Sequence, residues 1–395
     1  MMKTAMPLKK MMTWFISRQI RDENSDAYGM FPAWIDFETK APSFGYSEIT
    51  GYALSLNSFL GCILEPETSR RLQVTYSAEI AYRWIRDHFN KYGYFKTRIP
   101  LGDMSSHLLK TSNLHYLFDS GMILNGLVNY TQFSGSEEVR ETAFRVADYI
   151  MKEHFQGGEN IIPVKSQEVG AYSPDPLKWS VQKTAYLGKV AIGFSYLHFL
   201  AGGGRYLPFL ESLVSLLKAN VNDKGIFRSY NEPGRLHFHP FLYAVEAAFS
   251  LGEIFKDAEL TDLLVTNLDF IFGLQKRNGE LPSLIWDNQP VFAFRSDIHF
   301  QAVRMAAAVD HRTNSNRFTG RIERVLEFVL ENYTMENETE AAVWYGIDAE
   351  PLESVVQRKR EHLNVWATMF AIQANFLHEN VQAVKYLNSH PTFIV

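Results

Sequence analysis

The sequence predicts an all-α fold, an (α/α)6 toroid in which six helical hairpins close into a ring. The first observation behind this prediction is a set of turn glycines that recur along the 395 residues. These are Gly29, Gly93, Gly158, Gly225, Gly279 and Gly346, spaced by 64, 65, 67, 54 and 67 residues. Such a period is too long for a solenoid repeat, but it suits a pair of helices joined by a long loop.

The second observation is that two kinds of helix alternate around these glycines. Charged amphipathic segments precede the turns, and in residues 322–333 the apolar side chains recur at helical spacing, which indicates one face in water. More apolar segments follow the turns, and residues 49–60 carry no charge, which is typical of a helix buried on most sides. We expect one toroid over 1–395, with short β-turn segments at the hairpin loops. The predicted inner helices are 49–60, 120–133, 181–200, 240–251, 298–309 and 363–377.

The composition excludes several classes of protein. The net charge is −5, from 39 basic and 44 acidic residues without a basic stripe, so nucleic acid is not an expected partner. No uncharged apolar run reaches the ~18 residues of a membrane span, and no secretory signal is recognisable, so we expect a cytoplasmic protein. Cys62 is the only cysteine, which excludes an intramolecular disulfide and Cys-rich zinc sites, and we expect it in the core. We predict no cofactor and no metal.

Acidic residues recur where inner helices begin. Glu48, Asp119 and Asp297 each fall near the first turn of a predicted inner helix. In a toroid the loops that lead into the inner helices meet at one rim of the central funnel. Helix capping is a simple explanation for any one acid, whereas three acids around one cavity suit the acid and base of sugar chemistry. We expect Asp119 and Asp297 as the acid and base, with Glu48 and His239 as supports or replacements.

Two histidines also begin inner helices, namely His239, which precedes a proline, and His362. Either one alone is more typical of a hydrogen-bonded structural residue, whereas two on the same rim suit a proton-transfer pair. His237 and His239 at alternate positions suggest a metal site, but no acid or cysteine with suitable spacing accompanies them.

Aromatic and polar side chains near the same loops are candidates for binding a sugar. Aromatic planes stack on sugar rings, although several of these side chains could instead pack the helix ends. Arg295 could pair with a substrate carboxylate through its planar fork, or could form a structural salt bridge. The binding candidates are Trp34, Tyr52, Trp179, Lys183, Tyr243, Arg295, Gln301, Trp344, His362, Asn364 and Trp366.

The order of these motifs resembles that of the six-hairpin glycosidase-like superfamily. Within it, the chain is most similar to a branch found among polysaccharide and glycan-assembly proteins. The resemblance covers nearly the whole chain and implies the toroid and a carbohydrate substrate. The similar stretches are 47–52 (Ser-Glu-Ile-Thr-Gly-Tyr), 118–124 (Phe-Asp-Ser-Gly-Met-Ile-Leu), His239 with Tyr243, 297–301, and 364–367.

Residues 119–122 are also similar to the Asp-containing start of an inner helix in unsaturated glucuronyl hydrolases. Those enzymes use a second aspartate where the third inner helix begins. Here that place holds Trp179, Gln182 and Lys183, with only Asp175 upstream, a departure that argues against their vinyl-ether hydration.

A looser similarity connects His239, Glu246 and His362 with the acylglucosamine 2-epimerase group. That group uses rim histidines to move a proton beside a carbonyl. Glu246 is out of register with its counterpart, which weakens the connection.

Three functions follow from this sequence. The leading hypothesis is a glycoside hydrolase-like enzyme acting on an oligo- or polysaccharide, including those with uronic or amino sugars. The second is a sugar epimerase or isomerase in which His239 and His362 exchange protons. The third is a non-catalytic glycan-binding protein of a polysaccharide biosynthesis pathway. Terpene cyclases, which are also helical toroids, are excluded because the chain has no Asp-rich run.

Overall fold

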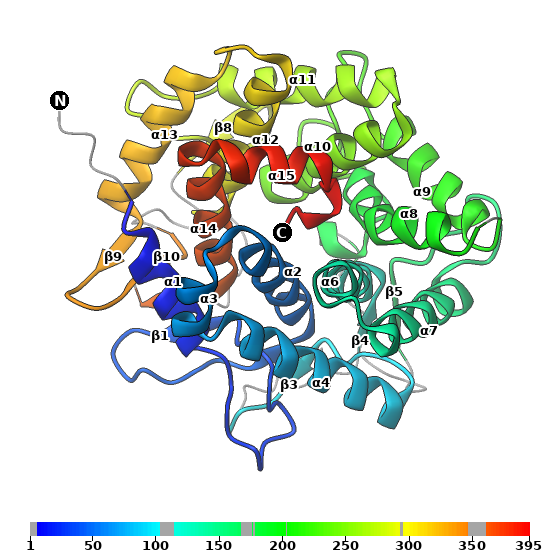
Figure 1. Cartoon of the computed structure of the whole chain (residues 1–395). Coiled ribbons are helices and arrows are strands. Elements are labelled where there is room, and N and C mark those ends of the chain that lie inside the picture. The colour runs from blue at the N-terminus through cyan, green and yellow to red at the C-terminus, as the bar shows by residue number, and fades with distance from the viewer. Residues whose placement is uncertain are drawn as a thin grey trace.

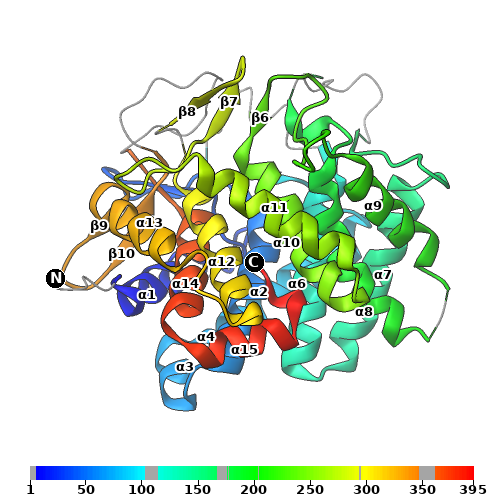
Figure 2. The ribbon, with the colours of Figure 1, turned by 90° about the horizontal axis from the view of Figure 1, so that it is seen from above.

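The computed structural model of the chain is a ring of helices, with short strands on one side of it (Figures 1 and 2). The structure describes residues 6–102, 114–166, 176, 178–202, 204–292, 295–346 and 361–395. Asp175, named above, lies outside the described residues. The order of the elements is that of six consecutive hairpins, each with an outer helix followed by an inner one. The (α/α)6 toroid predicted from the sequence is confirmed.

The inner helices line the middle of the ring and are buried almost all round, as their lack of surface charge predicts. The ring closes because α14, the last inner helix in the sequence, packs against α2, the first, as well as against its neighbour α12. The inner helices are α2 (Ser47–Ile63), α6 (Leu117–Ser134), α8 (Ala191–Leu200), α10 (Phe238–Phe255), α12 (Asp297–Thr313) and α14 (Val365–Glu379).

The outer helices expose one charged face to water and bury an apolar stripe against the inner ring. In α13, for instance, Ile322, Val325, Phe328 and Val329 are buried, and the acidic and basic residues lie off this stripe. The outer helices of the six hairpins are, in order, α1 (Leu8–Ser17), α4 (Val74–Tyr92), α7 (Glu137–His154), α9 (Leu207–Ala219), α11 (Ala258–Gly273) and α13 (Thr319–Asn332). A short helix α3 (Pro66–Leu72) precedes α4.

The third inner helix differs from its prediction of 181–200. The structure has a 3-10 turn η1 (Trp179–Val181), an extended residue at Thr184, and a second 3-10 segment η2 (Ala185–Val190) before α8. The apolar run alone did not reveal this break, since Thr184 interrupts the helix through its backbone (φ −130°, ψ −178°). As a result, the segment that leads into α8 consists of 3-10 turns and loop instead of one continuous helix.

Short strands join the loops on the rim side of the ring, and several lead directly into an inner helix (Figure 2). One sheet has the order β1-β11-β10-β9, two others pair β2 with β3 and β4 with β5, and the last has the order β6-β7-β8. All the pairs are antiparallel. The strands are β1 (Trp34–Asp36), β2 (Gly45–Tyr46), β3 (Arg98–Ile99), β4 (Leu114–Tyr116), β5 (Val164–Ser166), β6 (Leu236–His237), β7 (Leu284–Trp286), β8 (Gln289–Val291), β9 (Thr334–Glu336), β10 (Ala341–Trp344) and β11 (His362–Asn364).

The C-terminal segment closes the opposite end of the ring. After α14 the chain forms α15 (Val381–Ser389) and a 3-10 turn η3 (Pro391–Phe393), then runs inward toward the middle of the ring (Figure 1). Asn129 donates to the Thr392 carbonyl (2.9 Å), and Gln373 donates to the Phe393 carbonyl (2.8 Å). Because these backbone groups are buried, their hydrogen bonds to inner-helix side chains hold the segment in place.

Two further expectations concern the surface. Cys62 was expected in the core but is exposed, because it lies in the last turn of α2, where the helix leaves the packed centre. Within the described residues, the structure has no helix that is both long and apolar enough to span a membrane.

Candidate active site

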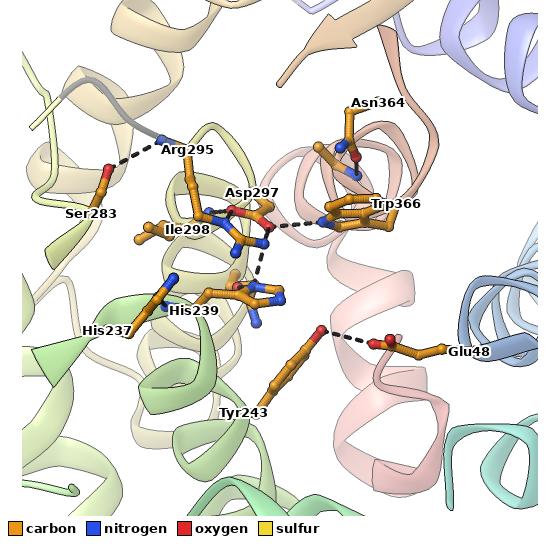
Figure 3. Close-up of polar contacts among 12 residues, drawn as sticks. Glu48, His237, His239, Tyr243, Ser283, Arg295, Asp297, Ile298, Asn364 and Trp366 are labelled. Atoms are coloured by element: carbon orange, nitrogen blue, oxygen red, sulfur yellow. Dashed lines mark hydrogen bonds and ion pairs between the residues drawn. The ribbon is translucent and has the colours of Figure 1, made fainter. Parts of the chain in front are cut away.

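Two side-chain groups meet at the rim where the inner helices begin: Asp297 with His239, and Glu48 with Asp119 (Figure 3 shows all but Asp119). Glu48, Asp119 and Asp297 all lie in the first turn of their helices, and His239 lies in the first turn of α10. A strand immediately precedes α2, α6 and α10 and fixes the direction in which each helix starts. Four predicted residues, distant in the sequence, are thus on the same side of the ring.

The Asp297 carboxylate is fully engaged by its neighbours. Its Oδ1 accepts from Arg295 Nε (3.1 Å) and from the Ile298 amide (3.0 Å), and its Oδ2 accepts from Arg295 Nη2 (2.5 Å) and Trp366 Nε1 (2.8 Å). Burial would raise the pKa of Asp297, but the Arg295 guanidinium and the other donors outweigh it and hold the pKa below its usual range. Asp297 is therefore ionised at neutral pH and has little capacity to take up a further proton.

His239 is held in one orientation by two acceptors. Its Nδ1 lies 2.8 Å from Gln301 Oε1 and 3.2 Å from Asp297 Oδ2, so Nδ1 carries the proton and Nε2 keeps its lone pair. In Figure 3 the other ring nitrogen faces the space between Trp366 and Tyr243. Burial, reinforced by Arg295, lowers the pKa of His239 to about 3, so the ring is neutral at physiological pH.

Glu48 and Asp119 form a second group on the neighbouring helices α2 and α6. The Tyr243 hydroxyl donates to Glu48 Oε1 (3.3 Å). Burial raises the pKa of Glu48, although nearby Tyr46, Lys189, Tyr52 and Tyr243 oppose this rise. Burial and then the Glu48 charge raise the pKa of Asp119 well above its usual value, and among the described residues Asp119 Oδ2 has no hydrogen-bond partner. The two carboxyl groups therefore differ, with the proton held more firmly on Asp119.

The packing of α2 on α6 brings these two carboxyl groups together. A Cβ atom at Gly51 would lie 2.7 Å from the Met122 carbonyl carbon, and one at Gly126 would lie 2.6 Å from the Gly51 oxygen. The two backbones can approach so closely only because both positions are glycine. Glu48 and Asp119 each lie three residues before one of these contact points, Gly51 and Met122, and so face the same part of the rim.

Sequence reasoning missed a cluster of buried charges beneath the site. Lys189 Nζ lies 2.7 Å from Glu246 Oε2, and Arg304 forms an ion pair with Glu246 Oε1. All three side chains are fully buried. Gln301 Nε2 donates to Glu246 Oε1 (3.3 Å) and so joins this cluster to His239. The sequence did contain a signal for this cluster, namely single charged residues within otherwise apolar inner helices. A charged side chain on a buried helix needs a buried partner, so these residues indicate buried ion pairs.

Several predicted binding residues lie on the β1-β11-β10-β9 sheet. The His362 ring stacks on Trp34 at 5.1 Å, and its Nε2 lies 4.0 Å from Asp36. Trp344 packs edge-on against Phe37 at 4.8 Å. None of these contacts involves His239, so the pairing of His239 with His362 stays a prediction.

The other predicted residues have varied surroundings. The Asn364 side chain caps α14 by accepting from the Ala367 amide (2.7 Å), and Trp179 packs edge-on against His239 at 5.9 Å. Lys183 lies between the end of η1 and the extended Thr184 that precedes η2, and it is exposed. It donates to the Glu159 carbonyl (3.0 Å) and so lies outside both side-chain groups. Arg295 forms the salt bridge with Asp297 that was one of its two anticipated roles.

The described side chains include no group of three or more His, Cys, Asp or Glu residues arranged to hold a metal ion. Proton transfer by the groups above is the chemistry that the arrangement can perform. The groups are Asp119, whose pKa burial raises well above its usual value, the carboxyl group of Glu48, and the neutral imidazole of His239.

Comparison of folds shows that the (α/α)6 toroid of this chain is shared with several solved structures of low sequence identity. No protein-family model and no curated protein sequence matches it. Cellobiose 2-epimerase from Bacillus thermoamylovorans is 12% identical, with a TM-score of 0.71 over 92% of this chain and 95% of that one. Unsaturated glucuronyl hydrolase from Bacillus sp. GL1 is 10% identical, with a TM-score of 0.68 over 94% and 97%. The GH76 α-mannanase from Bacteroides thetaiotaomicron is 11% identical, with a TM-score of 0.63 over 96% of each chain.

Proposed function

We propose that this protein is a carbohydrate-active enzyme that hydrolyses a glycosidic bond, with Asp119 as the acid and Glu48 as its partner. The observation that carries the proposal is the pair of neighbouring carboxyl groups whose surroundings separate their proton affinities. Glycoside hydrolysis requires one carboxyl group that donates a proton and one that is ionised. The fold neighbours named above all act on sugars by their names, which supports the substrate class.

In this mechanism Asp119 donates its proton to the glycosidic oxygen as the bond to the anomeric carbon breaks. Its Oδ2 suits this step, because no acceptor among the described residues competes for the proton. The Glu48 carboxylate either attacks the anomeric carbon or takes a proton from the attacking water. In both cases water supplies the new hydroxyl group on the sugar, and its second proton returns the pair to its starting state.

This assignment replaces Asp297 as the catalytic base. The two oxygens of Asp297 already accept from Arg295, Trp366 and a backbone amide, so taking up a proton would break these hydrogen bonds. We assign Asp297 a positioning role instead, since it holds the imidazole of His239.

The test is mass spectrometry of oligosaccharides incubated with the purified protein in heavy water. We expect shorter products with new reducing ends, and a loss of at least about 100-fold in turnover for Asp119→Asn and Glu48→Gln. Asp148→Asn is the matched control, because Asp148 pairs with Arg205 on the surface. Full turnover in both site variants would refute the assignment, and binding without any product would indicate a glycan-binding protein.

The second candidate function is epimerisation or isomerisation, and the geometry of His239 favours it. A neutral imidazole fixed by Asp297 is suited to removing a proton from a carbon beside a carbonyl, as in the Asp–His arrangement of other enzymes. The same experiment separates the two functions. Intact sugar that gains deuterium on carbon, and that fails to do so with His239→Gln, would establish epimerisation and exclude hydrolysis as the main activity.

A further inference from the structure

Lys189 is a buried cation that lies between the site and the charges beneath it. It belongs to η2, which packs between α6 and α10, and its side chain is fully buried. Its Nζ lies 4.6 Å from the ring centre of Tyr52 and 4.5 Å from that of Tyr243. These two rings stack with centres 6.3 Å apart, so the ammonium group lies against one aromatic ring from α2 and one from α10.

One of these rings connects the ammonium group to the carboxyl pair. The Tyr243 hydroxyl donates to Glu48 Oε1 (3.3 Å), while the ring of the same residue packs against His239 at 4.5 Å. A cation on the face of a phenol ring draws electron density from it and makes the hydroxyl a stronger donor. The position of Lys189 therefore favours a negative charge on Glu48.

Burial raises the pKa of Glu48, and the charge of Lys189 acts against this rise. The ion-pair partner of Lys189, Glu246, is shared with Arg304. An oxygen of Val395 accepts from both Lys189 (3.2 Å) and Arg304 (2.5 Å). In a buried site of low dielectric, a positive charge behind Glu48 stabilises its ionised form more than it would in water.

We propose that Lys189 is a positioning residue that keeps Glu48 ionised while Asp119 retains its proton, and so determines which carboxyl group is the acid. Burial favours the neutral form of both groups, and two adjacent carboxylates repel one another. Without a cation behind Glu48, both carboxyl groups would hold protons and the pair could donate but not accept. The inference rests on the proposed function for its catalytic meaning, but the protonation of the pair is measurable without any substrate.

Infrared difference spectroscopy of the full chain at neutral pH tests the proposal, because a protonated carboxyl group has its own carbonyl band. In the wild type we expect one such band from this pair, which disappears in Asp119→Asn and persists in Glu48→Gln. Lys189→Met should add a second band, which is lost again in Lys189→Met/Glu48→Gln. Lys189→Arg keeps the positive charge and should restore the wild-type spectrum.

Lys189→Met leaves Glu246 short of one partner and could prevent folding. Lys189→Gln removes the positive charge but keeps a polar group beside Glu246, and we expect the same second band from it. A carboxyl spectrum identical to that of the wild type, in whichever of these two variants folds, would overturn the proposal and leave Lys189 a structural residue. If a sugar substrate is found, the acid side of the kcat profile should move to higher pH in the same variant. A failure of the proposed reaction would leave the spectroscopic result unaffected.

Discussion

Gly51 of α2 lies against Met122 of α6 so closely that a Cβ atom at Gly51 would sit 2.7 Å from the Met122 carbonyl oxygen. The obstructing atoms belong to the backbone, so no side chain can turn aside to make room. This contact is one turn below Glu48 and Asp119. The distance between the two helices, and with it the separation of the two carboxyl groups, is thus set by a residue that has no chemistry of its own.

Gly51→Ala is therefore expected to damage both stability and activity. The added methyl group must push α2 away from α6, at a cost of about 1–3 kcal/mol in the free energy of unfolding. Denaturant unfolding and turnover measure the two effects. Gly273→Ala is the control, since a Cβ atom there meets nothing within 4 Å and should leave stability unchanged or slightly higher. Equal stability of the two variants would contradict the close packing.

The ion pair of Arg295 and Asp297 gives a second prediction. Asp297→Asn leaves the nearly buried guanidinium without its carboxylate, so we expect a loss of about 3–5 kcal/mol in the free energy of unfolding. In Arg295→Met/Asp297→Asn the unpaired charge is gone, and the loss should be smaller than the sum of the two single variants. Guanidinium unfolding of the four proteins measures the coupling. Asp269→Asn, in the exposed pair with Arg317, should cost no more than about 1 kcal/mol. Additive losses at Arg295 and Asp297 would refute the coupling.

The buried histidines predict how stability depends on pH. The pKa of His239 is lowered to about 3 by burial, whereas an unfolded histidine titrates near about 6.5. Above pH 6.5 the ring is neutral in both states and contributes no pH dependence. As the pH falls below that value, the unfolded state takes up a proton that the folded state refuses, so stability declines until the pH approaches 3.

His239→Gln should remove the contribution of His239 to the loss of stability below pH 6.5. Between pH 6.5 and pH 5 the single group accounts for about 1–2 kcal/mol. Urea unfolding at several pH values measures the slope, and His390→Gln, at an exposed position, is the control. If His239→Gln unfolds with the same pH slope as the wild type, the ring is not held neutral in the folded state.

The sequence predicted the ring well because the hairpin pattern is a matter of local periodicity. Residues 49–60 have no charge and therefore indicated a buried helix, and the structure has α2 there. The break at Thr184 was not predicted, because it depends on the backbone conformation of one residue within an apolar run. Periodicity reports which face of a segment is buried, but not whether the segment is continuous.

The sequence indicated which residues belong to the candidate site better than it indicated the role of each residue. Acids and histidines at the starts of inner helices could be identified from the sequence alone, and Glu48, Asp119, His239 and Asp297 each lie in the first turn of an inner helix. The hydrogen bonds of Asp297 could not be predicted from the sequence, because Trp366, which donates to Asp297, is 69 residues away. The partners of Lys189 are likewise on other helices, so only the folded chain shows what each charge faces.

Tyr243→Phe tests the connection between the ring of Tyr243 and the carboxyl pair. The variant keeps the aromatic face for Lys189 but removes the hydroxyl that donates to Glu48. A hydrogen bond to a charged group contributes about 1.5–3 kcal/mol, so we expect a fall in kcat of about 10- to 100-fold on any substrate that the enzyme turns over. The loss of a donor disfavours the carboxylate, so the acid side of the kcat profile should also move to higher pH. Tyr206→Phe, which removes a hydroxyl that donates to Asp148 near the surface, should leave both quantities unchanged. An unchanged pH profile in Tyr243→Phe would show that Glu48 does not depend on this hydroxyl, and the base would then have to be sought at His239.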